Sequence, residues 1–258
     1  MIDVTIIMPL KKLNKADEKH FTKAITSIEN LREKDNVGLL LVGPSKILEK
    51  AEEIFKKTES KISYELLPIE DTNIAVQINQ AALSCASKYF SVMEITDTYT
   101  NNWLTSIEPF MKANLSKSVY LTVIGVVNSD GKQEYFGNEM GWNPSYVNDN
   151  LGQITEEAIK AYPDFIFHGG LINTADFLSV HGLKASMKIA MWYEFALRLL
   201  RKGKEIYVVP KIGYLHIPLQ ISEKEISMEE GRWLVETADE ESHFDEDRGL
   251  KFEKTEGK

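Results

Sequence analysis

Four side chains in this sequence could bind a cation or transfer a proton: Glu94, Asp97, Glu194 and His216. Carboxylate oxygens bind divalent cations and accept protons, and a histidine can do either. Ordinary structural roles compete with this chemistry. Aspartate is common in turns, so we expect Asp97 to begin a turn that caps residues 99–103. A lone histidine such as His216 is more often hydrogen-bonded within the fold than a metal ligand.

Glu194 precedes Arg198 by four residues in a predicted helix, the spacing of an i,i+4 ion pair. Such a pair stabilises a helix by about 0.2–0.5 kcal/mol. We favour this surface ion pair over the alternative, that Glu194 is a general base. Two further residues, Trp103 and Trp192, lie within apolar helical patterns and are expected in the core. Cys85, in an alanine-rich helix, is expected to be an inert core residue.

The elements that must position these side chains alternate between strand and helix in the first hundred residues. Apolar runs predict strands at 4–8, 37–42, 62–67 and 89–93. Apolar residues at helical spacing predict helices at 17–31, 46–58 (with Ser45 as its cap) and 73–87. This alternation implies βαβ units, a mostly parallel sheet and an α/β fold.

The second half contains longer strands and loops. A strand is predicted at 118–128, followed by the turn Asn128-Ser129-Asp130-Gly131 and a second strand at 133–136. Residues 137–152, rich in glycine, asparagine and aromatics, are expected to form a loop. The remaining predictions are strands at 165–173 and 206–210 and helices at 174–180, 188–202 and 228–241.

Composition excludes several classes of protein. The 258 residues carry 30 Lys plus Arg, 39 Asp plus Glu and 43% hydrophobic residues, which is typical of a folded globular protein. The formal charge of −9 argues against nucleic acid as a partner. One cysteine excludes a disulfide framework and a cysteine-based zinc site. No apolar run is long enough for a membrane span and the start lacks a signal peptide, so we expect a cytoplasmic protein.

Charge also predicts the domain organisation. Residues 221–258 hold 13 acidic and 6 basic side chains, a net of −7, which leaves −2 on residues 1–220. We expect one domain at 1–220 and a helical, acidic C-terminal tail at 221–258. A solvated tail is the default interpretation, and a segment that binds protein partners is the alternative.

Three blocks of sequence resemble the family 2 glycosyltransferases of the GT-A fold. They are VTIIMPL at 4–10, INQAALSCASKYFSVMEITDTYTNNWL at 78–104, and FHGGLINTADFLSVHGL with MWYEFALRLLRKGKEIYVVPKIGYLHI within 167–217. The likeness spans about residues 2–218. It implies a three-layer sandwich around a mostly parallel central sheet. It also implies transfer of a sugar from a nucleotide-sugar donor, usually with a divalent metal on the diphosphate.

The resemblance places the family's metal motif, an Asp, a spacer and an Asp, over residues 94–97. Thr96 then stands where the principal carboxylate should be, and Asp97 could replace it only by a shift of one residue. In strand geometry that shift turns a side chain away. The resemblance nevertheless assigns nucleotide-sugar binding to Glu94, Asp97, Asn79 and Trp142, the last as an exposed ring that stacks on a sugar. In an active protein it assigns Mn²⁺ or Mg²⁺ to Asp97 and His216.

Two other acidic positions of the family are missing. Its catalytic Glu-Asp pair precedes a hydrophobic helix, and Met191 and Trp192 stand there in this chain. The family's aspartates that bind the nucleobase of the donor follow the second strand, where this chain has Val42-Gly43-Pro44-Ser45. We therefore predict a degenerate member, a pseudoenzyme that has lost metal-dependent transfer, needs no cofactor and serves as a structural or binding module.

The alternative is an active transferase with a displaced site. It would use Glu94, Asp97 and His216 around Mn²⁺ or Mg²⁺, with Asp97 and Glu194 as catalytic residues and Glu194 as the base. A third hypothesis is a carbohydrate-binding module that uses Trp142. The tail, with Trp233 and SHFDEDR, is similar to tails of such domains encoded by tailed bacteriophages. That likeness implies a virion component, located in the host cytoplasm or the virion, with a protein or glycan as partner.

Overall fold

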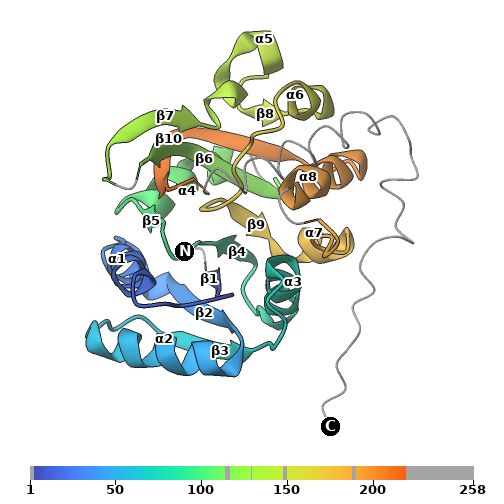
Figure 1. Ribbon diagram of the computed structural model, residues 1–258. Coiled ribbons are helices and arrows are strands. Elements are labelled where there is room, and N and C mark those ends of the chain that lie inside the picture. Colours follow the sequence, from blue (N-terminus) through green and yellow to red (C-terminus); the bar gives the residue numbers. More distant parts are fainter. Residues whose placement is uncertain (1–2, 114–116, 129, 148–149, 188–189, 219–258) are drawn as a thin grey trace.

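The computed structural model describes all residues except 1–2, 114–116, 129, 148–149, 188–189 and 219–258 (Figure 1). Its strands are β1 Val4–Pro9, β2 Val37–Gly43, β3 Tyr64–Pro68, β4 Tyr89–Val92, β5 Thr98–Tyr99, β6 Val119–Val127, β7 Gln133–Gly137, β8 Gln153–Ile154, β9 Leu171–Asn173 and β10 Ile206–His216. Its α-helices are α1 Asp17–Glu29, α2 Ser45–Lys57, α3 Ile74–Ser84, α4 Trp103–Ala113, α5 Pro144–Val147, α6 Glu156–Ala161, α7 Thr174–Ser179 and α8 Met191–Arg201. Two 3-10 helices are η1 Lys34–Asn36 and η2 Glu139–Trp142.

The strands form one sheet in the order β3-β2-β1-β4-β9-β6-β10-β5, with β7 beside β6 and β8 beside β10. Strands β1 to β4 pair in parallel, as do β6 and β10. Strand β9 lies between β4 and β6 and is antiparallel to both. It follows that β4, β6 and β10 all run in the same direction, so their carboxyl ends lie at one edge of the sheet. The predicted mostly parallel sheet is confirmed.

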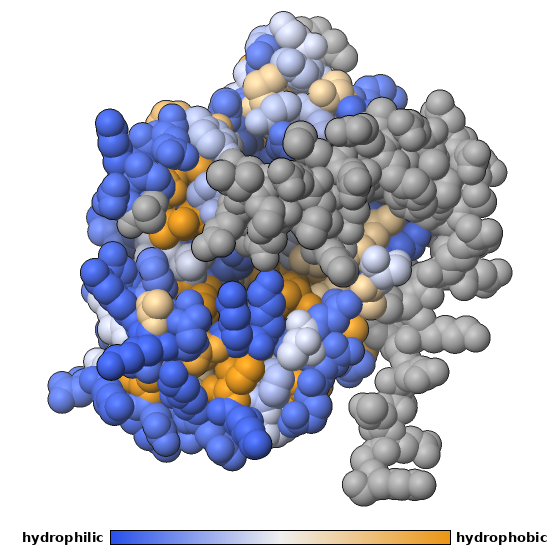
Figure 2. Space-filling model, viewed as in Figure 1, coloured by the Kyte–Doolittle hydropathy of each residue, from blue (hydrophilic) through white to orange (hydrophobic). Residues whose placement is uncertain are grey.

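Helices cover both faces of the sheet, which gives the predicted three layers (Figure 1). Adjacent residues of β1 point to opposite faces: Ile6 and Met8 pack with α1, α2 and α4, while Ile7 packs with α3, α7 and α8. The helices are amphipathic, and Figure 2 shows mainly hydrophilic residues on the outer surface over α1 and α2. None of the described helices combines the length and apolar composition that spanning a bilayer requires.

Several predicted boundaries needed correction. The predicted strand at 165–173 is a strand only over β9, because the chain turns at Gly169, where φ is +71° and a Cβ atom would lie 2.4 Å from the Tyr214 ring. The predicted loop at 137–152 contains η2 and α5. The predicted strand at 206–210 continues as β10 to His216. The tail at 221–258 and its helix at 228–241 lie outside the described residues.

The predicted cap of α2 is wrong. Ser45 is the first residue of the helix, and it does not cap its own backbone. Instead its N–H and its hydroxyl both donate to the carboxylate of Glu70, at 3.1 and 2.6 Å. A carboxylate beside the first turn satisfies a free N–H group and is favoured by the helix dipole.

Glu29 ties the end of α1 to two later segments and should make stability depend on acid. Its carboxylate accepts hydrogen bonds from Lys34 Nζ, Ser60 Oγ and the Lys61 N–H. The hydrogen bonds from Lys34 and Ser60 are the main reason that its pKa falls from 4.5 to about 2. Because the folded pKa is depressed, this stabilisation is present above pH 4.5 and disappears as the pH falls towards 2.

We expect Glu29→Gln to lower the free energy of unfolding at pH 7 by about 1–2 kcal/mol, a modest figure because solvent screens a side chain that is 25% exposed. Urea unfolding at pH 7 and pH 3 measures this, and the variant should lose less stability than the wild type between the two. Glu49→Gln, at an exposed position of α2, is the control and should change stability by less than about 0.5 kcal/mol. Parallel pH profiles for wild type and Glu29→Gln would contradict the prediction.

Candidate functional site

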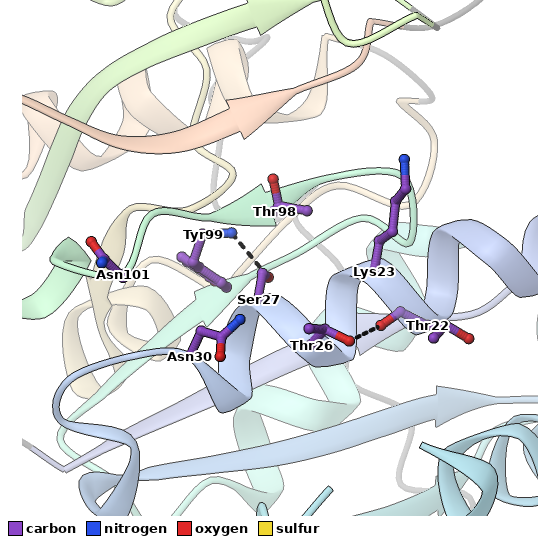
Figure 3. A pocket seen from close by; sticks show the side chains of 8 residues that line it. All are labelled: Thr22, Lys23, Thr26, Ser27, Asn30, Thr98, Tyr99 and Asn101. Carbon is purple, nitrogen blue, oxygen red and sulfur yellow. Dashed lines mark hydrogen bonds between the residues drawn. The ribbon is translucent and has the colours of Figure 1, made fainter. Parts of the chain in front are cut away.

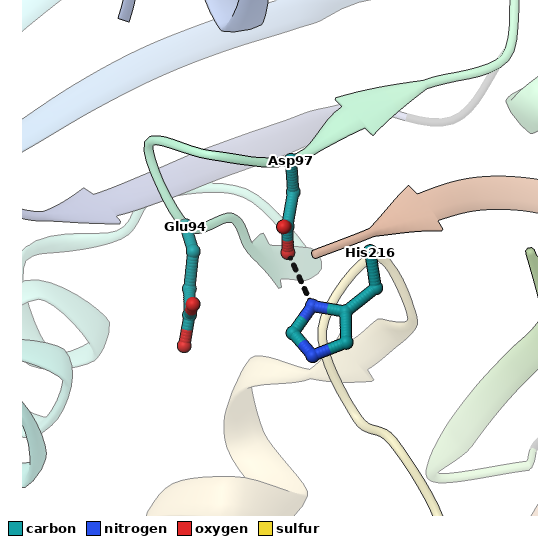
Figure 4. A group of neighbouring side chains, drawn as sticks. All are labelled: Glu94, Asp97 and His216. Atoms are coloured by element: carbon teal, nitrogen blue, oxygen red, sulfur yellow. Dashed lines mark hydrogen bonds and ion pairs between the residues drawn. The ribbon is translucent and has the colours of Figure 1, made fainter. Parts of the chain in front are cut away.

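Glu94, Asp97 and His216 lie together at the carboxyl edge of the sheet (Figure 4). Glu94 and Asp97 belong to the loop after β4, and His216 is the last residue of β10. One possible ligand atom from each lies within 4.8 Å of the other two. Since β4 and β10 run in the same direction, their ends deliver these side chains to one edge. We call these three residues the acidic–histidine cluster.

The loop after β4 explains why Asp97 reaches the cluster. Strand β4 ends at Val92, and the Asp97 N–H donates to the Glu94 carbonyl at 3.1 Å, which closes a turn. Alternation of side chains therefore stops before Asp97. The expectation that a shift of one residue would turn Asp97 away is wrong, because it assumed strand geometry in a segment that is a turn.

Asp97 is buried and holds the end of β10 in place. One carboxylate oxygen lies 2.8 Å from His216 Nδ1, and the other accepts the Ile217 N–H at 3.0 Å and the Thr96 hydroxyl at 3.2 Å. The predicted cap of residues 99–103 is absent among the contacts of the described residues, because this carboxylate is already engaged by β10. Asp97 does lie in a turn, as predicted, but its carboxylate contacts His216 and does not cap the following segment.

The pKa values of two histidines of the site are shifted in opposite directions. Burial lowers the pKa of His216, but the charge and hydrogen bond of Asp97, with the charge of Glu94, outweigh burial and raise it above 6.5. Burial dominates for His168 and lowers its pKa, although the charge of Glu94 opposes this. His168 Nε2 lies 3.5 Å from Glu94 Oε1, and its ring stacks on that of His216 at 6.0 Å.

Two further residues of the site, His168 and Tyr214, were not among the residues singled out from the sequence. The buried Tyr214 hydroxyl accepts the Glu94 N–H at 3.3 Å, and burial together with the charge of Asp97 raises the pKa of this phenol well above 10. Tyr214 and His216 are two residues apart on β10, so they share a face of the strand. That spacing was the available signal for Tyr214, whereas no local signal joined His168 to Glu94.

Glu194 does not join the cluster. The predicted ion pair with Arg198 is confirmed, with oxygen–nitrogen distances of 2.7 and 2.8 Å. Its predicted surface location is wrong: Glu194 is 0% exposed and also lies 3.1 Å from Lys184 Nζ. Arg198 in turn donates to the carbonyls of Val180 and Gly182. Glu194 is thus held by two cations in the core, which opposes its assignment as a catalytic base.

Asn79 and Trp142 are occupied within the fold. The buried Asn79 side chain donates to the Leu183 carbonyl and accepts the Leu183 N–H, both at 2.8 Å, so its amide has little capacity left for a nucleotide sugar. Trp142 was expected to expose its ring. Instead the ring is half-buried, packs against the core and donates its indole N–H to the Val208 carbonyl at 2.8 Å. That expectation is wrong because η2 folds Trp142 onto β10.

The two tryptophans expected in the core are confirmed there, whereas Cys85 is only half-buried and directly follows α3. Trp103 is 0% exposed and Trp192 is 7% exposed. Burial raises the pKa of the Cys85 thiol to about 11, which keeps it protonated and unreactive. Met191 and Trp192 form the start of α8, so that position holds no proton acceptor.

A separate hollow of about 400 Å³ lies between α1 and β5 (Figure 3). Hydroxyl and amide side chains dominate its lining, among them Thr26, Ser27, Asn30 and Asn101. Of the described residues that line it, none is acidic or a histidine. It is therefore distinct in chemistry from the acidic–histidine cluster.

The chemistry of the cluster fits a divalent cation. It offers two carboxylates and one imidazole, donors that suit Mn²⁺, while Mg²⁺ prefers oxygen. When His216 donates Nδ1–H to Asp97, its other nitrogen, Nε2, keeps a lone pair for a cation. A carboxylate that orients a ligating histidine in this way is a common arrangement in metal sites.

Known proteins resemble this chain in their three-dimensional structure and not detectably in sequence. No protein-family model matches the sequence. No curated protein matches it. Among solved structures, S. aureus TarS 1–349 is similar with a TM-score of 0.64 at 15% identity over 94% of this chain and 68% of that one. The same fragment in complex with UDP-GlcNAc has a TM-score of 0.64 at 14% identity, covering 95% and 69%.

The mannosyltransferase PcManGT from Pyrobaculum calidifontis, in complex with GDP-Man and Mn²⁺, has a TM-score of 0.64 at 12% identity. The match covers 89% of this chain and 63% of that one. These structural neighbours are glycosyltransferases of the GT-A type, and the expected GT-A-like fold is confirmed. At such low identity the likeness extends to the fold alone.

Proposed function

We propose that this protein binds a nucleotide sugar together with Mn²⁺ or Mg²⁺ at the acidic–histidine cluster, as a member of the family 2 glycosyltransferases. The convergence of Glu94, Asp97 and His216 at the carboxyl edge of a GT-A-like sheet carries this proposal. Ligands of open α/β sheets bind at that edge. The neighbour solved with GDP-Man and Mn²⁺ supports the choice of ligand.

Each residue of the cluster has a role in binding. Glu94 is the most accessible, with 30% of its side chain exposed. His216 offers one nitrogen, and the buried Asp97 fixes the ring through the other. A cation bound there would neutralise charge on the diphosphate leaving group. Two hydrogen bonds hold the acidic residues in position. The Tyr214 hydroxyl accepts the Glu94 N–H, and the Ile217 N–H donates to the Asp97 carboxylate.

A second candidate function is a binding module that no longer transfers sugar. Inversion at the anomeric carbon requires a group that accepts the proton of the acceptor hydroxyl. Met191 and Trp192 cannot accept a proton, and Glu194 is paired with Lys184 and Arg198. These observations favour binding without transfer, so we propose that the degenerate feature is the base and not the cation site.

Calorimetry separates these possibilities. Wild-type protein is titrated with UDP, GDP and CDP sugars in the presence of Mn²⁺ and again with excess chelator. Micromolar binding of one of them that disappears with chelator supports the proposed function, whereas no binding of any of them contradicts it. Release of free nucleoside diphosphate from the bound donor, with or without an added glycan, then indicates transfer or hydrolysis. A donor that binds without turnover supports the binding module.

Cation binding should weaken in mild acid. A proton on His216 competes with the cation for the ring, and the pKa of His216 is raised by Asp97 and Glu94 despite burial. We expect the apparent affinity for Mn²⁺ to fall by about tenfold per pH unit below that raised pKa. Titration of Mn²⁺ between pH 8 and pH 5 measures this. In His216→Gln the weaker remaining affinity should lose this dependence, and an unchanged dependence would exclude His216 as a ligand.

The domain organisation and the partners remain part of the proposal. We propose that residues 1–220 form the nucleotide-sugar-binding domain and that the acidic segment 221–258 binds a protein partner or lies beside a glycan. The likeness of that segment to tails encoded by tailed bacteriophages suggests a virion or host-cytoplasm location. Deletion of residues 221–258 should leave nucleotide-sugar binding intact if the division is correct.

A further inference from the structure

Trp192 differs from the other described tryptophans in its indole N–H. Trp103 donates this group to the Gly169 carbonyl at 2.7 Å, and Trp142 donates it to the Val208 carbonyl at 2.8 Å. The Trp192 N–H is buried and has no hydrogen-bond partner among the described residues. A buried donor without a partner costs free energy, and a bound ligand that accepts this hydrogen bond would remove that cost.

The ring of Trp192 is fixed beside the acidic–histidine cluster. It meets the His168 ring edge to face, with centroids 5.9 Å apart and an angle of 81°. His168 itself stacks on His216 and lies 3.5 Å from Glu94. On the side of the core, Trp192 stacks on Phe167 at 5.4 Å and 3°. Aromatic packing therefore holds the indole one ring away from the residues of the cluster.

We infer that the Trp192 indole N–H donates a hydrogen bond to a hydroxyl of the sugar in the bound nucleotide sugar, an inference that rests on the proposed function. The sugar is bonded directly to the diphosphate, so a diphosphate at the cluster places the sugar next to it. Indole is a donor that cannot accept a proton, and aromatic rings with a few placed polar groups recognise sugars. Trp192 therefore determines affinity for the sugar and is not a base.

Trp192→Phe tests this, because it keeps an aromatic ring and removes the donor. Affinity for the nucleotide sugar, measured with Mn²⁺, should fall about tenfold, while affinity for the corresponding nucleoside diphosphate should stay within about twofold. Trp103→Phe is the matched control. It also removes an indole donor, but one paired with the Gly169 carbonyl, so it should lower thermal stability and leave the ratio of the two affinities unchanged.

Deoxy analogues of the sugar provide a second measurement on the wild-type protein. Wild type should bind one of these analogues about tenfold more weakly than the parent nucleotide sugar. Trp192→Phe should bind that analogue and the parent equally well. The inference is overturned if the diphosphate binds but Trp192→Phe retains full affinity for the sugar nucleotide. It is also overturned if every deoxy analogue binds wild type as tightly as its parent. If wild type binds no nucleotide with Mn²⁺, the proposed function fails, and this inference fails with it.

Discussion

Asp97→Asn should weaken Mn²⁺-dependent binding of the nucleotide sugar by at least about 100-fold. Asparagine keeps the size of the side chain and can still accept the Ile217 N–H, but it removes the negative charge. Asp97 is buried and lies 2.8 Å from His216 Nδ1, so the substitution removes one ligand oxygen and the group that orients another ligand. Losing an orienting partner alone commonly costs 10–100-fold in metal affinity. Calorimetry with Mn²⁺ and the nucleotide sugar measures the loss.

Thr96→Val is the matched control for this prediction. The Thr96 hydroxyl donates to Asp97 at 3.2 Å, so valine removes a hydrogen bond next to the site without removing charge. We expect its effect on binding to stay within about tenfold. Binding of the nucleotide sugar by Asp97→Asn at wild-type affinity would show that the cluster does not hold the cation. The thermal unfolding temperature of each variant shows whether a loss of binding reflects loss of the fold.

Glu194→Gln should lower the free energy of unfolding by about 3–5 kcal/mol. The glutamate is 0% exposed and pairs with both Lys184 and Arg198, which are themselves buried. Removing its charge takes away the carboxylate that both buried cations share. Because Arg198 also donates to the carbonyls of Val180 and Gly182, the segment that joins α7 to α8 should loosen as well. Urea unfolding at pH 7 measures the change.

Glu156→Gln provides the comparison, since Glu156 also pairs with an arginine and a lysine but is 28% exposed. Solvent screens that pair, and we expect a loss below about 1 kcal/mol. Replacing Glu194, Lys184 and Arg198 together with apolar residues of similar size should restore much of the stability lost in Glu194→Gln. If Glu194→Gln instead keeps wild-type stability and loses turnover of a bound donor, Glu194 is a base and its structural assignment is wrong.

The local sequence pattern predicted most elements of this fold. Continuous apolar runs gave β1, β2 and β4 within a residue or two, because strands covered on both faces carry no polar alternation. The spacing of apolar residues located α1, α2 and α3, because each helix buries one face and so repeats its apolar residues at helical intervals. The irregular segment before β9 could not be predicted, since its path depends on contact between Gly169 and Tyr214, 45 positions further along the chain and on another strand.

The sequence alone predicted the alternation of strands and helices in the first hundred residues and the pairing of Glu194 with Arg198, because these follow from residues near one another in the chain. The GT-A-like architecture was predicted from the resemblance to a known family. Only the tertiary structure decided which polar side chains meet. Asp97 and His216 are 119 positions apart and touch because β4 and β10 end at the same edge of the sheet. Burial of Glu194 and the packing of Trp142 on β10 are likewise decided by neighbours that no local spacing encodes. Periodicity fixes which face of an element is apolar, whereas the meeting of distant side chains depends on how the strands are ordered.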